Sequence, residues 1–123
     1  MKNLTLTFLM LISTQVFCQS QRFEYDLINL NTNGEWLPKD IGMKSILILE
    51  KETIKNYVGD NRFEYTIVQR FSRDELELDE TLTLIFAALV LDEENQEVII
   101  LITDQFTSIT DVAKKMTFRY SNN

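Results

Sequence analysis

The chemistry open to this chain is set largely by the residue types that it lacks. The sequence contains no histidine, and its one cysteine, Cys18, lies near the N-terminus. Without histidine, Ser-His-Asp and Cys-His catalytic arrangements are impossible. The residues after Cys18 also offer no cysteine or histidine for a zinc site of the usual kind. The three glycines, Gly34, Gly42 and Gly59, lie apart from one another, so there is no glycine-rich phosphate loop. Carboxylates are the remaining groups that could bind a metal or transfer a proton.

The densest run of carboxylates is found at residues 74–80. Ca²⁺ takes about six to eight oxygen ligands, so an acidic loop is a candidate site for it. The spacing follows no known calcium-loop signature, and the turn glycine of such loops is missing. We interpret the segment as a solvated loop that keeps a neighbouring apolar strand from pairing with other chains. The members of this run are Asp74, Glu75, Glu77, Asp79 and Glu80.

A second acidic run, at residues 92–97, is interpreted as the polar loop of a hairpin rather than as a metal site. A catalytic pair of carboxylates would need a cleft that holds an acid facing a nucleophile. A small β-meander has little room for such a cleft. We therefore predict no catalytic, cofactor-binding or metal-binding residues, no cofactor and a non-enzymatic protein.

Aromatic residues could instead stack on sugar rings or line an apolar cavity. Phe23, Tyr25, Phe63 and Tyr65 alternate along predicted strands, a pattern more typical of core packing. Trp36, which lies beside a turn and shortly before the only proline, is the aromatic residue that we expect to be exposed.

The elements that must position these residues are organised around residues 81–103. Two apolar runs, 82–91 and 98–102, are separated by the polar residues 92–97. They predict an antiparallel hairpin in the centre of a sheet, covered on both faces because both faces are apolar. A helix over residues 75–91 is the alternative, but Thr81, Thr83, Ile85 and Val90 disfavour it. Each run is too short to cross a bilayer as a helix, which needs roughly 20 apolar residues.

Further strands are predicted at residues 22–28, 45–49, 53–57, 63–68 and 116–120. Asn33-Gly34 is a strong hairpin-turn signal. The polar strand 53–57 is expected near a sheet edge, and residues 104–111 are expected to be irregular. In the first strand, alternation places Tyr25 on one face and Ile28 on the other. The sequence thus predicts an all-β fold, a single antiparallel meander of about seven strands that forms a curved sheet or small barrel over residues 19–123.

Residues 1–18 have the order of a secretory signal peptide. Lys2 is followed by the mostly apolar residues 4–12 and then by a polar exit. We predict cleavage near Cys18 and Gln19, and a secreted or periplasmic protein. The alternative is a lipoprotein anchored through Cys18, but Phe17 and Gln15 are unusual at the positions before a lipid-modified cysteine.

Without the signal peptide, the chain keeps 11 of its 12 basic residues and all 19 acidic residues, a net charge of −8. This charge argues against nucleic acid as a partner and against docking on an anionic membrane surface. No cysteine remains for a disulfide, so packing alone must hold the domain together.

The order of these signals resembles small exported proteins that are common in Bacteroidota. The shared features are an early aromatic strand, Trp36 after Asn33-Gly34, an apolar hairpin and a final strand with Phe118, Arg119 and Tyr120. Many of those proteins carry cysteines near the central hairpin, where this chain has Phe86-Ala87-Ala88. The resemblance implies an all-β fold and export, and no activity is established for such proteins.

Two functions remain open after this sequence analysis. The first is an exported module that binds a protein or glycan through a sheet face or an exposed edge. The second is a small barrel that holds an apolar ligand between its strands. An internal cavity would favour the second, and a packed interior with an exposed aromatic patch would favour the first.

Overall fold

The computed structural model describes residues 20–38 and 42–122, which fold into strands joined by turns and one short 3₁₀ turn. The predicted signal peptide (residues 1–18), its cleavage site before Gln19 and the alternative lipid anchor at Cys18 lie outside the described residues. In chain order the elements are β1 (Gln21–Tyr25), β2 (Leu27–Thr32), β3 (Glu35–Trp36), β4 (Ser45–Leu49), β5 (Thr53–Val58), β6 (Asn61–Arg70), η1 (Arg73–Glu75), β7 (Leu84–Leu91), β8 (Glu97–Thr103), β9 (Thr107–Asp111) and β10 (Met116–Ser121).

All these strands form one sheet in the order β1-β4-β5-β6-β7-β8-β9-β10-β2-β3. Every neighbouring pair is antiparallel, and from β4 to β10 each strand pairs with the next one along the chain. The predicted all-β antiparallel meander is confirmed. The sheet has ten strands rather than about seven. Residues 104–111, expected to be irregular, contain β9, and the first predicted strand is divided at Asp26 into β1 and β2.

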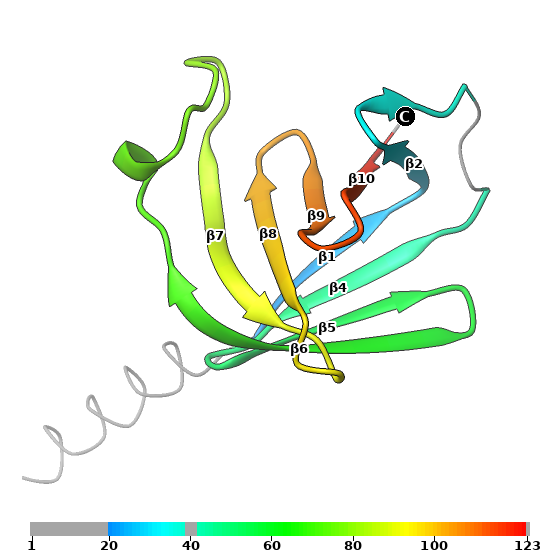
Figure 1. Ribbon diagram of the computed structural model, residues 1–123, viewed down its shortest axis with the longest axis horizontal. Coiled ribbons are helices and arrows are strands. Elements are labelled where there is room, and N and C mark those ends of the chain that lie inside the picture. The colour runs from blue at the N-terminus through cyan, green and yellow to red at the C-terminus, as the bar shows by residue number, and fades with distance from the viewer. Residues whose placement is uncertain (1–19, 39–41, 123) are drawn as a thin grey trace, which may run out of the picture.

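The sheet curls on itself because the segment of residues 21–32 contributes strands to both of its ends. β1 pairs with β4, whereas β2 pairs with β10, and only Asp26 separates β1 from β2. Asn122 binds both sides of this junction. Its Oδ1 accepts a hydrogen bond from the Asp26 backbone N–H at 3.1 Å, and its Nδ2 donates to the Glu24 carbonyl at 3.0 Å. The result is a barrel-like, curled sheet around one interior (Figure 1).

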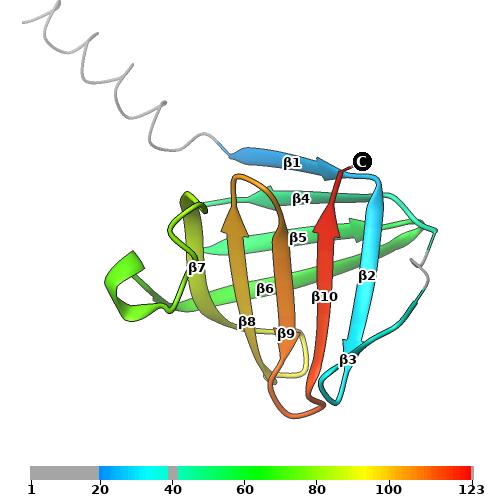
Figure 2. The same cartoon turned by 90° about the horizontal axis from the view of Figure 1, so that it is seen from above.

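Two corners let the sheet change direction, so that β1, β4, β5 and β6 cross β7, β8, β9, β10 and β2 (Figure 2). One corner is the bend at Asp26. The other is the irregularity between Ile67 and Gln69, where the register of β6 against β7 shifts. An extra residue in one strand bends it and increases its twist, which is how strands turn the corners of orthogonally packed sheets.

The bend at Asp26 also corrects one sequence prediction. Strict alternation put Tyr25 and Ile28 on opposite faces, yet both side chains are buried, at 8% and 1% exposure. The alternation changes phase at the bend, so residues on either side of Asp26 point into the same interior.

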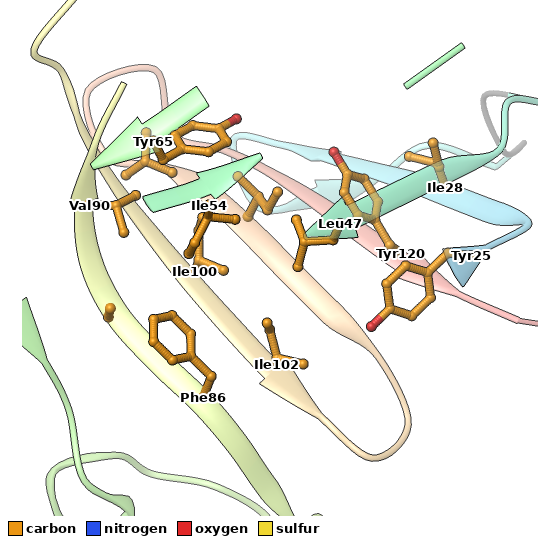
Figure 3. Close-up of a cluster of buried hydrophobic side chains, with 13 residues drawn as sticks. Tyr25, Ile28, Leu47, Ile54, Tyr65, Phe86, Val90, Ile100, Ile102 and Tyr120 are labelled. Carbon is orange, nitrogen blue, oxygen red and sulfur yellow. The ribbon is translucent and has the colours of Figure 1, made fainter. Parts of the chain in front are cut away.

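Alternate residues of the central hairpin fill that interior. On β7 these are Phe86, Ala88 and Val90, and on β8 the residues Ile100 and Ile102 face them (Figure 3). Apolar residues on alternate positions of facing strands bury one side of each strand. The helical alternative for residues 75–91 is wrong, because residues 84–91 are a strand.

The expectation that both faces of this hairpin are covered is also wrong. Ile85 and Ile99 are 43% and 38% exposed. A single sheet that curls around one interior presents only one face of each strand to it. Ile85 and Ile99 therefore have no second layer above them in the part of the chain that the structure describes, whereas the smaller Ala87, also out of phase with Phe86 and Ala88, is 3% exposed.

Candidate ligand-binding cavity

One end of the interior is hollow. A cavity of about 770 Å³ opens between the β5–β6, β7–β8 and β9–β10 turns. This volume lies within the range of roughly 300–1,000 Å³ that small-molecule sites occupy. Its walls come from β2, β5, β6, β8, β9 and β10. The side chains that line it below the turns are Ile28, Asn56, Val58, Phe63, Tyr65, Val98, Ile109, Phe118 and Tyr120.

The wall is mostly apolar because it continues the inward-facing positions of the sheet. Val98 follows the phase of Ile100 and Ile102 on β8, and Phe118 follows that of Tyr120 on β10. Ile109 is paired with both Ile100 and Phe118, which places it between these strands. Apolar ligand surface that is buried against such a wall gains about 25 cal/mol of hydrophobic transfer free energy per Å².

The exposure of Phe63 indicates that side chains do not fill this end of the interior. Phe63 lies on β6 in phase with the buried residue Tyr65, so its ring is on the inner side of the sheet. Even so, Phe63 is 46% exposed, and Met43, another lining residue, is 43% exposed. Large apolar side chains that face inward and still contact solvent mark surface that a ligand could cover.

One polar side chain is buried in the wall. Asn56 of β5 is 1% exposed, and its Nδ2 donates a hydrogen bond of 2.9 Å to the Tyr120 hydroxyl. Within the described residues, Asn56 Oδ1 has no hydrogen-bond partner. A buried carbonyl oxygen without a partner costs about 1–3 kcal/mol. The cavity is thus apolar over most of its wall, and the Asn56 amide is almost completely shielded from the open space.

The mouth of the cavity carries negative charge. The β7–β8 turn contributes Asp92, Glu93 and Glu94, the end of β9 contributes Asp111, and the β9–β10 turn contributes the cation Lys114. Asp92 also shapes its own turn, since its Oδ1 accepts hydrogen bonds from the backbone N–H groups of Glu94 and Gln96, at 2.9 and 2.8 Å.

Burial and this negative charge both act on the cavity tyrosines. Burial raises the pKa of Tyr120 to about 12, against a smaller lowering effect of the hydrogen bond from Asn56. The pKa of Tyr65 is also raised, first by burial and then by the charges of neighbouring groups that include Asp92 and Asp111. Both phenols are therefore neutral at physiological pH. The carboxylates of the mouth contribute to the raised pKa of Tyr65 from across the cavity.

The other residues considered in the sequence are not brought together into a site. Asp79 of the acidic run accepts hydrogen bonds from the backbone N–H and hydroxyl of Thr81, which lower the pKa of its carboxyl. Arg73 donates to the Leu82 and Asp79 carbonyls across the same loop. Over residues 20–38 and 42–122, no group of three or more acidic, histidine or cysteine side chains is placed to hold a metal ion.

Trp36 is 44% exposed, as expected, but one face of its ring is covered. The Arg119 guanidinium carbon lies 4.6 Å from the Trp36 ring centroid and 4.7 Å from the centroid of Phe106. Such cation–π contacts contribute about 0.5–1 kcal/mol each at exposed positions. The arginine between the two rings thus occupies a surface on which a sugar could otherwise stack.

Asn56 is the residue that sequence reasoning missed. Its strand, residues 53–57, was expected near a sheet edge because it is polar, and this is wrong, since β5 lies between β4 and β6. A polar residue at an inward position between Ile54 and Val58 was the available signal. Its meaning depends on knowing that β5 is an interior strand.

Comparison of the chain with protein-family models, with curated proteins and with solved structures finds no match. The fold and the cavity therefore carry the functional argument by themselves.

The described residues contain no helix of the length and apolar character that crossing a membrane would require.

Proposed function

We propose that this protein is an exported, non-enzymatic binding protein that holds a small, largely apolar ligand inside its curled sheet. The observation that carries the proposal is the cavity of about 770 Å³ with its apolar wall. The sequence analysis left two functions open, and an internal cavity was the feature expected of the ligand-binding alternative. Export rests on the signal-peptide pattern of residues 1–18 alone.

The other alternative, binding of a protein or glycan partner on the outer surface, has less support. Its best candidate residue, Trp36, is already stacked on Arg119. The exposed apolar residues of the outer hairpin face, Ile85 and Ile99, are aliphatic and carry no polar group that would orient a glycan.

The test is the binding of a neutral, environment-sensitive fluorophore, N-phenylnaphthylamine, to the purified protein after extraction of bound lipid. We expect a saturable rise in fluorescence with one site per chain. Val98→Phe places a ring in the cavity and should weaken binding at least about tenfold, a loss of roughly 1.4 kcal/mol.

Val68→Phe is the matched control, because it makes the same change at an exposed residue that does not line the cavity. It should bind the fluorophore as the unmodified protein does. Absence of saturable binding, or equal binding by both variants and the unmodified protein, would contradict the proposed function. Mass spectrometry of the protein purified from its native host would then identify what it carries.

A further inference from the structure

We infer that the hydroxyl of Tyr65 is the polar contact for the ligand, and that the ligand is an apolar molecule with an uncharged oxygen acceptor, such as a ketone, an ester or an alcohol. This inference rests on the proposed function and specifies its ligand. Two observations carry it: this hydroxyl is open to the cavity without a partner, and the wall around it carries no charge.

The Tyr65 hydroxyl is a polar group of the wall that a ligand can reach. Tyr65 lies on β6, lines the cavity and is 9% exposed. Within the described residues its hydroxyl has no hydrogen-bond partner. Among the described residues that are not exposed, only Asn56 Oδ1 and Ser45 Oγ are both unpartnered and shielded, so the Tyr65 hydroxyl keeps contact with open space. Figure 3 shows it pointing away from Val90 and Phe86.

The other two tyrosines of the interior differ in this respect. The Tyr120 hydroxyl accepts a hydrogen bond of 2.9 Å from Asn56 Nδ2. The Tyr25 hydroxyl is hydrogen bonded to Thr107, and Tyr25 does not line the cavity. Of the three phenols, the one on Tyr65 is therefore both unpartnered and part of the cavity wall.

This phenol acts as a donor at physiological pH. Burial, followed by the effect of neighbouring groups, raises the pKa of Tyr65, so the hydroxyl keeps its proton. A ligand that displaces water from such a group without replacing its hydrogen bond loses affinity. A ligand that places an oxygen acceptor at the hydroxyl keeps the bond.

The wall also indicates that this acceptor is uncharged. The side chains that line the cavity below the turns carry no charge at neutral pH. Arg62 and Glu64, which also border the cavity, form an ion pair with each other at 3.0 Å. A charged group that entered the apolar part would lose its hydration and find no counter-charge there, which is unfavourable. A neutral oxygen needs only the one donor that Tyr65 offers.

The experiment compares two competitors of nearly the same shape: methyl octyl ketone and the alkene in which a methylene group replaces its carbonyl oxygen. Each displaces N-phenylnaphthylamine from the unmodified protein and from Tyr65→Phe, which removes only the hydroxyl. The affinity for the ketone should fall about fivefold in Tyr65→Phe, and the affinity for the alkene should not fall. A change in cavity shape would act on both competitors, so the difference between them isolates the contact between hydroxyl and carbonyl.

Tyr57→Phe is the matched control. It makes the same change on β5, at a residue that does not line the cavity, and should leave both affinities unchanged. Infrared spectroscopy supplies a second measurement, because a hydrogen bond from a phenol lowers the stretching frequency of a carbonyl group. The frequency of the bound ketone should be lower in the unmodified protein than in Tyr65→Phe, and lower than in a hydrocarbon solvent.

The outcomes separate this inference from the proposed function. An unchanged affinity of Tyr65→Phe for the ketone, an equal loss for ketone and alkene, or a carbonyl frequency equal to that in hydrocarbon overturns the inference and leaves an apolar carrier. Failure of the fluorophore and of both competitors to bind the unmodified protein overturns the proposed function itself. If Tyr65→Phe does not fold, the carbonyl frequency in the unmodified protein decides the question.

Discussion

The two halves of the interior belong to one sheet and differ in how completely they are filled. In the packed half, Leu47, Ile54, Phe86, Ile100 and Ile102 belong to one buried cluster with little or no exposure. In the hollow half, β2, β5, β6, β8, β9 and β10 border an open cavity, so β5 and β8 contribute to both halves. The boundary crosses individual strand pairs, since Ile100 of the packed half is paired with Ile109 of the cavity wall. One sheet can thus supply a stabilising core and a binding site, with no additional element for either.

Each half contains one buried hydrogen bond between side chains. In the packed half, the hydroxyls of Tyr25 and Thr107 hydrogen bond to each other. In the hollow half, Asn56 Nδ2 donates to the Tyr120 hydroxyl. Buried polar atoms without a partner among the described residues occur on both sides of the boundary: Asn56 Oδ1 in the hollow half, and Ser45 Oγ beside Tyr25. Each such atom costs stability, whereas a buried polar pair stabilises the fold.

The largest expected effect is the loss of a side chain from the packed half. Ile100→Ala and Phe86→Ala remove buried groups of the central hairpin and should each cost about 2–5 kcal/mol, from lost transfer free energy and the cavity left behind. The domain as a whole is expected to have only about 5–15 kcal/mol of stability. The measurement is the chemical-denaturation midpoint. Glu94→Ala, at an exposed turn position, should change stability by less than about 0.5 kcal/mol. Equal midpoints for all three variants would show that the packed half does not hold the fold.

High pH tests how well the hollow half excludes water. An unfolded tyrosine titrates near 10.0, and burial raises the pKa of folded Tyr120 to about 12. Above pH 10 the unfolded chain therefore binds fewer protons than the folded one, and the free energy of unfolding falls as the pH rises. The stability is fully present below pH 10 and is lost between about pH 10 and 12, at up to about 1.4 kcal/mol per pH unit for this residue.

The measurement is the denaturation midpoint as a function of pH, with the tyrosine absorbance titrated in parallel. Tyr65 and Tyr25, whose pKa values are also raised by burial, add to the same decline. Tyr120→Phe should make the decline less steep. If Tyr120 ionised near pH 10 in the folded protein, the hollow half would be open to water to the depth of this residue.

A matched pair of enlargements compares the two halves directly. Val90 and Val98 are paired across β7 and β8 and are 0% and 3% exposed, but only Val98 lines the cavity. Val90→Phe forces a ring into filled space and should cost about 1–3 kcal/mol. Val98→Phe has room and should cost clearly less. Thermal denaturation of both variants measures the difference, and equal destabilisation would mean that the hollow half is not hollow.

The smallest expected effect concerns the two hydroxyl pairs. Tyr25→Phe leaves the fully buried hydroxyl of Thr107 without its partner and should cost about 1–3 kcal/mol. Tyr120→Phe leaves the Nδ2 of Asn56, a residue that is 1% exposed, without its partner, so its cost should be of the same size, about 1–3 kcal/mol. Urea denaturation at neutral pH measures both values. A negligible cost for Tyr120→Phe would contradict the burial of Asn56.

The fold was predictable from the sequence because its signals are local. Alternation in residues 63–68 and the apolar runs of the central hairpin predict strands without knowledge of their partners. The prediction failed where alternation was interrupted. At Asp26 a bend changes the phase, and the Thr- and Ser-rich β9 has polar outward positions that resemble a loop. The sequence contains no direct sign that one short segment supplies both ends of the sheet.

The cavity was not predictable in the same way. A hollow depends on the difference between the volume that a closed sheet encloses and the volume of the side chains pointing into it. Those side chains come from strands far apart in the sequence, such as Ile28, Asn56 and Tyr120. Inward residues that border empty space, such as Phe63, have the same apolar character as inward residues that fill it.

The division of residues 21–32 between the two ends of the sheet sets an order of events in folding. The hairpins from β4 to β10 join neighbouring segments and can form as soon as both strands have been synthesised. The pairing of β2 with β10 joins Leu27 to Ser121, so it must wait for the last strand. Long-range pairings of this kind slow folding, since the entropy of closing the loop is lost before the contacts form. Until that moment β2 has an unpaired edge that another chain can bind, and the risk of aggregation belongs to the period before closure.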